Sequence, residues 1–459
     1  MICRPRSVVW LVLVLGGLAI TWADDVKYAL RERNRVGQQW LTNLRTQVEV
    51  EPKGSKNKVV VSAEHRLWES VLALAEVNPS HPGKPFAQGI RPGLPVRLAR
   101  YYERADWQRQ LQGVVSASDS GSALEKRQLR SERRWLVAWR GPDQTVVFSP
   151  NGPLTREELD LTQGHLDLLM VPNLLPEQLV AVGDTWTVPI PAVQALCGLD
   201  GVTEAHVQGK LTAVRDGCAF VSIEGQVAGI VDGSETNNRI RATCEFDLNF
   251  ERWLCLHWQQ TQQRQAGPVT PALTLQADIR AERRFDGQCE HLTPALLQNL
   301  PPEPTTPFVL LTYRAPKNAC EFLYDRAWHR VAQDERFAVF RLLDRGELIA
   351  QMNVTFWADA PPGQHLSPDQ IRQFAHQTPQ FQLEKVVESG EMPSQDGRWI
   401  YRHTVQGKSE GLPILLTWYV VANQQGRQVV FVFTVEPTLA DKLGGRDLAI
   451  VQSVSFPSR

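Results

Sequence analysis

Few residues in this chain have both the type and the spacing that catalysis or metal binding requires. Cys255 and His257 lie two positions apart in WLCLHW and would share one strand face, but a metal ion needs at least one or two further ligands. Ser55 and Lys58 fit the S-x-x-K pattern, in which a lysine activates a serine, yet they lie in the polar stretch PKGSKNK, which is typical of a solvated turn. The chain has no HExxH, CxxC or phosphate-cradling glycine motif. We therefore predict no catalytic residue, no metal site and no cofactor.

The cysteines suggest a disulfide framework in place of a reactive site. Cys3 belongs to the N-terminal segment, and an even number remains, which permits three disulfides whose connectivity the sequence does not fix. In TCEFDLNFERWLCLHW, a hairpin centred between Asn249 and Phe250 would place Cys244 opposite Cys255, within disulfide reach. The alternative is that both are buried free thiols. The six are Cys197, Cys218, Cys244, Cys255, Cys289 and Cys320.

The stretch PEQLVAVGDTWTVP, residues 176–189, resembles a ligand loop at first sight. Gly183 and Asp184 are typical turn residues, and the alternating apolar residues on either side favour short extended segments. We interpret the stretch as architecture, with Trp186 anchoring the entry into a sheet. Trp186→Ala should then reduce stability and leave any binding activity in place.

Composition places the chain among globular proteins and argues against nucleic acid as a partner. It has 459 residues, of which 42% are apolar and 22% charged, so two or three domains are expected. Its 49 basic residues almost cancel its 50 acidic ones, which leaves no overall field to hold a phosphate backbone. The 14 tryptophans are an excess that most simply packs sheet faces, the alternative being that some line an apolar groove.

The first residues are typical of a secretory signal peptide. Arg4 and Arg6 precede an apolar run over residues 8–20, and a small residue, Ala23, ends the segment before two aspartates. The run is too short to span a bilayer comfortably. We expect cleavage after residue 23, no transmembrane segment in the mature chain and an extracytoplasmic location, periplasmic or secreted; an uncleaved anchor is the alternative.

Residues 24–290 have the pattern of an antiparallel, β-rich domain with few helices. Short runs at 58–63, 144–149, 206–214, 218–229 and 269–279 are rich in β-branched or alternating apolar residues. One helix is indicated over residues 156–170. Thr155 and Glu158 could form a capping box at its start, and Pro172 should stop it.

A proline-rich stretch, residues 291–308, is the best candidate for a linker between two domains. After it, residues 309–459 contain a strand at 348–357, with Leu348 to Phe356 alternating toward a core, and a helix opened by Ser367, Pro368 and Asp369. Further strands at 381–389, 398–405, 414–421 and 428–435 and a last helix at 447–452 complete an α+β arrangement.

This last third resembles the PsbP-like fold of extracytoplasmic α+β domains. The resemblance rests on FRLLDRGELIAQMNVTFW, the helix opened by SPDQ, the paired strands ILLTWYVV and QVVFVFTV, and the closing LAIVQSVSF. It implies an assembly, stabilising or binding subunit and supplies no site residues. The N-terminal part, through PLTREELDLTQGHLDLL and LPEQLVAVGDTWTVP, is similar to β-rich bacterial domains of unknown function in secreted proteins and lipoproteins, which implies a fold and no activity.

The sequence therefore favours a secreted or periplasmic, non-catalytic binding or structural protein of two domains. Its partner would be another protein or an apolar ligand. A carrier of a lipid or other hydrophobic molecule is the first alternative, and an extracytoplasmic hydrolase whose polar residues meet only in the fold is the second.

Overall fold

The computed structural model describes residues 26–76, 90–112, 124–141, 143–163, 166–394 and 396–458. The predicted signal peptide, residues 1–23, lies outside them. None of the helices in these ranges combines the length and apolarity that a bilayer crossing requires. The fold is rich in antiparallel strands with few, short helices.

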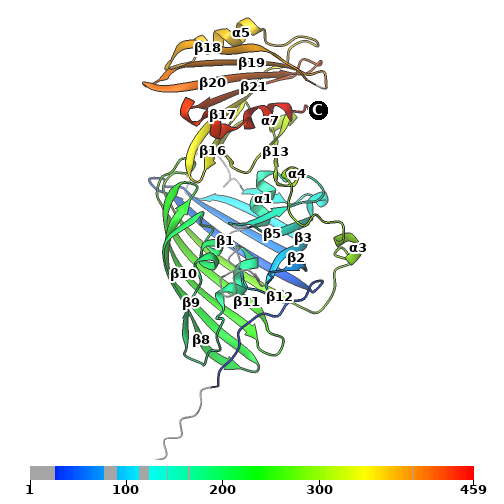
Figure 1. The fold of residues 1–459 in the computed structure, drawn as a ribbon, viewed down its shortest axis with the longest axis vertical. Helices are drawn as coiled ribbons and strands as arrows, with labels where there is room; N and C mark the ends of the chain where they lie inside the picture. The colour runs from blue at the N-terminus through cyan, green and yellow to red at the C-terminus, as the bar shows by residue number, and fades with distance from the viewer. Residues whose placement is uncertain are drawn as a thin grey trace, which may run out of the picture.

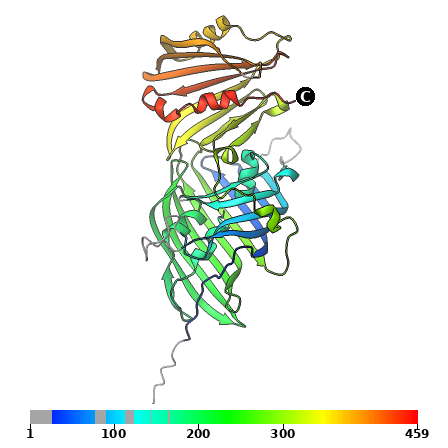
Figure 2. The same ribbon diagram turned by 45° about the vertical axis from the view of Figure 1, so that its right-hand side comes forward.

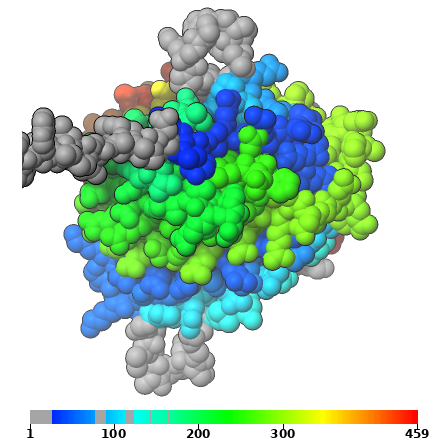
Figure 3. Space-filling view, turned by 90° about the horizontal axis from the view of Figure 1, so that it is seen from below, coloured from blue at the N-terminus to red at the C-terminus, as the bar shows by residue number. Residues whose placement is uncertain are grey.

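A twelve-stranded, strongly curved antiparallel sheet forms the larger part of the molecule, blue to green in Figure 1. Its strands follow the order β6-β5-β3-β2-β1-β12-β11-β10-β9-β8-β7, and β4 pairs with β3. Seen from below in Figure 3, the blue first strands and the yellow-green last strand lie against one another, as the β1–β12 pairing requires. The strands are β1 Gln39–Pro52, β2 Lys58–Leu74, β3 Pro95–Gln112, β4 Leu124–Gln128, β5 Trp135–Arg140, β6 Thr145–Phe148, β7 Thr185–Thr187, β8 Gly201–Arg215, β9 Cys218–Val231, β10 Ser234–Asp247, β11 Arg252–Arg264 and β12 Leu273–Arg284.

The sheet has one buried face and one solvated face, because apolar and polar residues alternate along its strands. On β1, Leu44 and Val48 point inward while Arg45 and Gln47 are exposed. The inner face packs against the segment that follows α1, so this sheet covers a core on one side only. The covering elements are α1 Arg156–Gln163, the 3-10 helix η2 Leu168–Leu174 and α2 Ile190–Leu196; another 3-10 helix, η1, spans Ser131–Arg133.

The start of α1 agrees with the predicted capping box. The Glu158 amide donates to Thr155 Oγ1 at 3.2 Å, and the Thr155 amide donates to Glu158 Oε2 at 3.0 Å. The predicted length is wrong, because α1 ends at Gln163. Pro172 does not stop the helix but lies inside the separate 3-10 helix η2.

A seven-stranded antiparallel sheet forms the other part, in the order β15-β16-β17-β21-β20-β19-β18. The helices α5 and α7 pack on its opposite faces, and α5 lies at the end of the molecule away from the larger sheet (Figures 1 and 2). Its elements are β15 Trp328–Gln333, β16 Phe337–Asp344, β17 Glu347–Phe356, α5 Pro368–His376, β18 Phe381–Met392, β19 Trp399–Ser409, β20 Leu412–Ala422, β21 Gln428–Val435, η4 Pro437–Leu439, α6 Ala440–Leu443 and α7 Arg446–Gln452.

Two details of this part test the sequence pattern. The cap of α5 forms as predicted, with Ser367 Oγ accepting from the Gln370 amide at 3.3 Å. On β17, however, Leu348 is 40% exposed and does not share the buried face of Met352 and Val354. A bulge beside Leu343 shifts the pairing there, so the alternation begins only after it.

The segment between the two sheets packs closely against both. Leu292 and Leu300, within the predicted linker 291–308, are buried against residues of β3, β5 and β6. A single apolar cluster continues from α1, through Leu159, to Tyr313 and Phe340 of the second part. The elements here are α3 Pro294–Leu297, α4 Thr306–Val309, β13 Leu311–Arg314, η3 Pro316–Asn318 and β14 Glu321–Tyr324.

Candidate functional site

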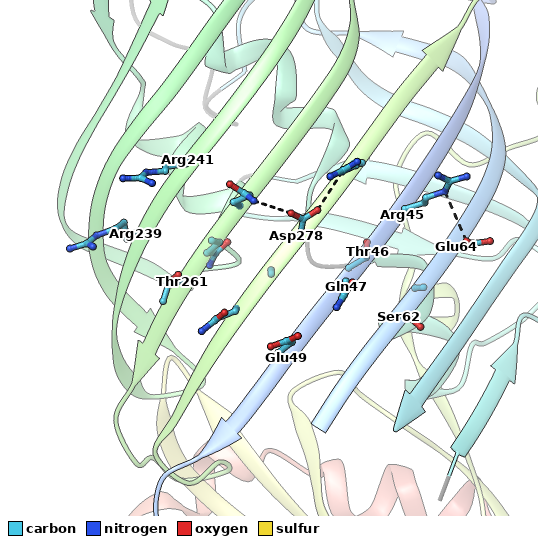
Figure 4. Close-up of a pocket in the computed structure, with 16 residues that line it drawn as sticks. Arg45, Thr46, Gln47, Glu49, Ser62, Glu64, Arg239, Arg241, Thr261 and Asp278 are labelled. Carbon is cyan, nitrogen blue, oxygen red and sulfur yellow. Dashed lines mark hydrogen bonds and ion pairs between the residues drawn. The ribbon is translucent and has the colours of Figure 1, made fainter. Parts of the chain in front are cut away.

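The solvated face of the larger sheet is hollowed where five neighbouring strands, β10, β11, β12, β1 and β2, run side by side (Figure 4). We call this feature the outer hollow, and its volume is about 840 Å³. The side chains drawn in Figure 4 stand on consecutive strands and are polar almost throughout. It is lined by Arg45, Thr46, Gln47, Glu49, Ser62, Ala63, Glu64, Arg239, Arg241, Gln259, Gln260, Thr261, Gln276, Ala277, Asp278 and Arg280.

Strand register aligns these side chains in rows across the sheet. Arg241 is paired with Gln259, Gln259 with Asp278, Asp278 with Gln47, and Gln47 with Ser62. Strands lie about 4.8 Å apart, so such a row presents hydrogen-bonding groups at regular intervals over roughly 20 Å. The hollow is therefore an ordered polar surface that five strands build together.

Charges of both signs alternate within the outer hollow. Its lining holds four arginines and three carboxylates. Asp278 accepts hydrogen bonds from His257 Nε2 at 2.9 Å and Gln259 Nε2 at 3.0 Å. Although partial burial acts to raise it, these hydrogen bonds lower the pKa of Asp278, which is ionised at neutral pH. Arg239 and Arg241 are exposed and have no ion-pair partner in the described part of the chain.

The sequence-predicted zinc fragment belongs to this polar face. His257 is bonded to Asp278, and Cys255 lies opposite Glu245 on one side and Glu282 on the other. Across the described ranges, no three His, Cys, Asp or Glu side chains gather as a metal site would require. The face therefore offers hydrogen-bonding groups and charges rather than a set of metal ligands.

The structure does not bring Ser55 and Lys58 together as a catalytic pair. Ser55 Oγ accepts from the Asn57 amide at 3.0 Å, in the turn between β1 and β2. The Lys58 ammonium is engaged with two carboxylates of β1, Glu49 and Glu51. Each side chain thus has a local structural partner.

The predicted Cys244–Cys255 disulfide is not formed, and all six described cysteines are free thiols. The hairpin of β10 and β11 does form, but Cys244 pairs with Leu256, while Cys255 pairs with Glu245. A bulge after Glu245 moves the register by one residue, which sends the two thiols to opposite faces of the sheet. Cys244 is buried in the core, and burial raises the pKa of its thiol above the ordinary range.

Gly183, Asp184 and Trp186 occupy a tight turn and the short strand β7. Gly183 has a φ of +100°, and Asp184 Oδ2 accepts from the Ala181 amide at 2.8 Å, which closes the turn. Trp186 is 6% exposed, and its indole Nε1 donates to the Leu174 carbonyl at 2.8 Å. These contacts belong to the covered inner face and lie away from the outer hollow.

A serine–histidine contact in the smaller sheet had no signal in the sequence. Ser389 on β18 pairs with His403 on β19, which places Ser389 Oγ 3.0 Å from His403 Nδ1 and 2.7 Å from the Tyr401 hydroxyl. Burial lowers the pKa of His403, with nearby Arg372 acting in the same direction. No carboxylate hydrogen-bonds His403 in the described ranges, so the third member that orients a catalytic histidine is lacking there. Hydrogen bonds thus connect Arg372 to Tyr401, Tyr401 to Ser389, and Ser389 to His403.

Comparison with known proteins gives no function for this chain. No family model and no curated protein matches it. Among solved structures, cyanobacterial PsbP (CyanoP) from Synechocystis sp. PCC 6803 is 18% identical, with 38% of this chain and 99% of that chain covered and a TM-score of 0.27. The protein of unknown function PA94 from Pseudomonas aeruginosa, a putative regulator, is 17% identical over 33% and 98% of the chains, with a TM-score of 0.22. The T6SS immunity protein TplEi from Pseudomonas aeruginosa is 11% identical over 55% and 96%, with a TM-score of 0.19. None of these three likenesses assigns a fold or a function to this chain.

Proposed function

We propose that this chain is an extracytoplasmic, non-catalytic binding protein that docks a polar protein partner on the outer hollow. One observation carries the proposal: five neighbouring strands form a hollow of about 840 Å³ whose lining is polar and charged. A concave surface with several hydrogen-bonding groups in fixed register suits recognition, because it orients a partner without ordering new groups.

The balance of charges favours a protein over a polyanion. Four arginines and three carboxylates in one hollow give neither sign a large excess, whereas binding of nucleic acid needs a concentrated positive patch. Arginine is enriched at protein interfaces, and its planar fork suits carboxylates. The exposed Arg239 and Arg241 are the groups that would meet acidic side chains of the partner.

Carriage of a lipid or other apolar ligand receives no comparable support. Such carriers need an apolar cavity. The outer hollow is lined by charged, amide and hydroxyl groups, and the cavity on the other side of the sheet holds several arginines and aspartates. The contact between Ser389 and His403, which a hydrolase could use, lies in neither hollow.

Site-directed photocrosslinking in the source cells tests the proposal. A photoreactive phenylalanine at Gln259, on the floor of the outer hollow, should give a covalent adduct with a defined protein. The same group at Glu384, exposed on β18, is the matched control and should not give that adduct. Arg239→Glu with Arg241→Glu should remove most of the adduct while the circular dichroism spectrum stays unchanged.

Two results would contradict docking on this face. One is the absence of any adduct specific to position 259. The other is an adduct whose yield does not change when both arginines are replaced by glutamate. The partner's acidic groups would then face like charges, so docking on this face predicts a lower yield.

A further inference from the structure

A second hollow lies beneath the inner face of the larger sheet, and we call it the inner cavity. Its volume is about 410 Å³. Its floor comes from β3, β5, β6, β11 and β12, and its roof comes from α1 and the C-terminal end of α2. We infer that the inner cavity binds a small zwitterion, a molecule of amino-acid or dipeptide size that carries one carboxylate and one ammonium group.

The inner face of the sheet changes from apolar to polar where it meets this cavity. Along β11, the fully buried Trp253 and Trp258 are followed on the same face by Gln260 and Gln262, which are 7% and 2% exposed. Gln260 Nε2 donates to Asn238 Oδ1 on β10 at 2.8 Å. Burying amides costs free energy that apolar residues would not cost, so this end of the core is shaped for something other than stability.

A buried guanidinium supplies the feature that would recognise a carboxylate. Arg100 lines the cavity with its side chain 6% exposed, and its Nε is 3.0 Å from Glu69 Oε1. Glu69 also accepts from Trp40 Nε1 and Thr42 Oγ1, each at 2.7 Å. Arg100 Nη2 has no acceptor in hydrogen-bonding geometry within the described residues. A desolvated guanidinium with an unused donor favours a carboxylate strongly.

Aspartates on the roof and rim of the cavity supply the complementary feature. The Asp160 carboxylate, on α1, makes no hydrogen bond or ion pair among the described residues. Asp160 is exposed on α1, so its carboxylate is accessible to a ligand that enters from solvent. Asp200, beyond α2, accepts from the Asp232 amide at 2.6 Å. These acids would hold an ammonium group.

The charges of the whole lining exclude the simpler ligands. The cavity holds three arginines against five aspartates, so a plain anion would meet an excess of like charge. A plain cation would pair with Asp160 and leave the unused donor of Arg100 buried and unsatisfied. A zwitterion satisfies both, and a volume of this size accommodates an amino acid or a dipeptide.

Calorimetric titration of the full chain tests the inference with chemically matched probes. Each standard L-amino acid, and glycylglycine, is compared with its N-acetyl form, which lacks the ammonium group, and its methyl ester, which lacks the carboxylate. At least one free compound should bind with a Kd on the order of millimolar or tighter, and both blocked forms should bind about tenfold more weakly or not at all. Failure of every free compound, or equal binding of a blocked form, would overturn the inference.

Variants separate this site from the outer hollow. Asp160→Asn removes the ammonium partner at a cavity-facing position and should weaken binding about tenfold or more. Asp369→Asn, exposed on α5, is the matched control and should bind as the wild type does. Arg100→Lys should also reduce the affinity for the free compound. If the Arg100→Lys protein fails to fold, Asp160→Asn still tests the inference. Photocrosslinking at Gln259 should be unaffected by Asp160→Asn, so the two proposals can fail independently.

Discussion

Trp186 is the residue whose role the structure defines most fully. Its ring is buried, its indole nitrogen is bonded to Leu174, and its ring covers Gly209 on β8. We expect Trp186→Ala to lower the free energy of unfolding by about 3–5 kcal/mol, because it leaves a large cavity and an unpaired carbonyl. Urea unfolding followed by circular dichroism measures this, and crosslinking at Gln259 should survive under native conditions.

Gly209 provides the internal control for that prediction. A Cβ at Gly209 would lie 2.3 Å from the Trp186 ring, so Gly209→Ala should destabilise the wild type. In the Trp186→Ala background the same change has room and should cost far less, which gives a large coupling energy in a double-mutant cycle. Additive effects of the two substitutions would show that the ring does not rest on Gly209.

His65 should make the stability of the protein sensitive to acid. It is 5% exposed on β2 and packs edge-on against Tyr102, with ring centroids 6.0 Å apart. Burial lowers the pKa of His65 to about 4 from its ordinary value of 6.5. The unfolded chain therefore binds a proton that the folded chain does not, so stability is complete above pH 6.5 and is lost as the pH falls toward 4.

The size of this effect follows from the pKa difference. It corresponds to about 3 kcal/mol between pH 7 and pH 4. Urea unfolding over this pH range should show a smaller loss for His65→Phe than for wild type, by about that amount. His206→Phe, exposed on β8, should retain the wild-type profile. Parallel profiles for His65→Phe and wild type would refute a neutral buried imidazole.

At the scale of the element, the sequence predicts strands well where one face is buried. The runs at 206–214 and 218–229 lie within β8 and β9, because apolar residues must alternate on a sheet that covers a core on one side. Helix lengths are less predictable. Residues 156–170 have helical spacing, but α1 spans only Arg156–Gln163, and the separate 3-10 helix η2 begins at Leu168.

Both hollows escaped prediction because they depend on pairing between distant strands. Gln47 and Asp278 are neighbours only through the register of β1 with β12, which joins the two ends of the sheet's sequence. The single bulge after Glu245 was enough to move Cys244 away from Cys255. Local patterns fix which face a residue occupies, whereas register, bulges and sheet order decide what it meets there.

At the scale of the whole molecule, the two sheets are joined by polar contacts as well as by the shared apolar cluster. Arg326, just before β15, donates from Nη2 to the Val147 carbonyl of β6 at 2.7 Å and from Nε to the Val309 carbonyl at 2.8 Å. Arg156 of α1 donates back to the Arg326 carbonyl at 2.7 Å. Gly233 and Gly346, in turns of the two sheets, approach so closely that a Cβ on Gly233 would lie 2.3 Å from the Gly346 oxygen.

These contacts lead us to expect that both sheets unfold together. Scanning calorimetry should show one transition whose calorimetric and van't Hoff enthalpies agree. Arg326→Ala should lower stability by about 2–4 kcal/mol, because two carbonyls at the junction lose their donor. Arg336→Ala, exposed near the start of β16, should change little. Two well-separated wild-type transitions would mean that the predicted proline-rich linker, residues 291–308, divides the chain energetically, despite the burial of Leu292 and Leu300 against the larger sheet.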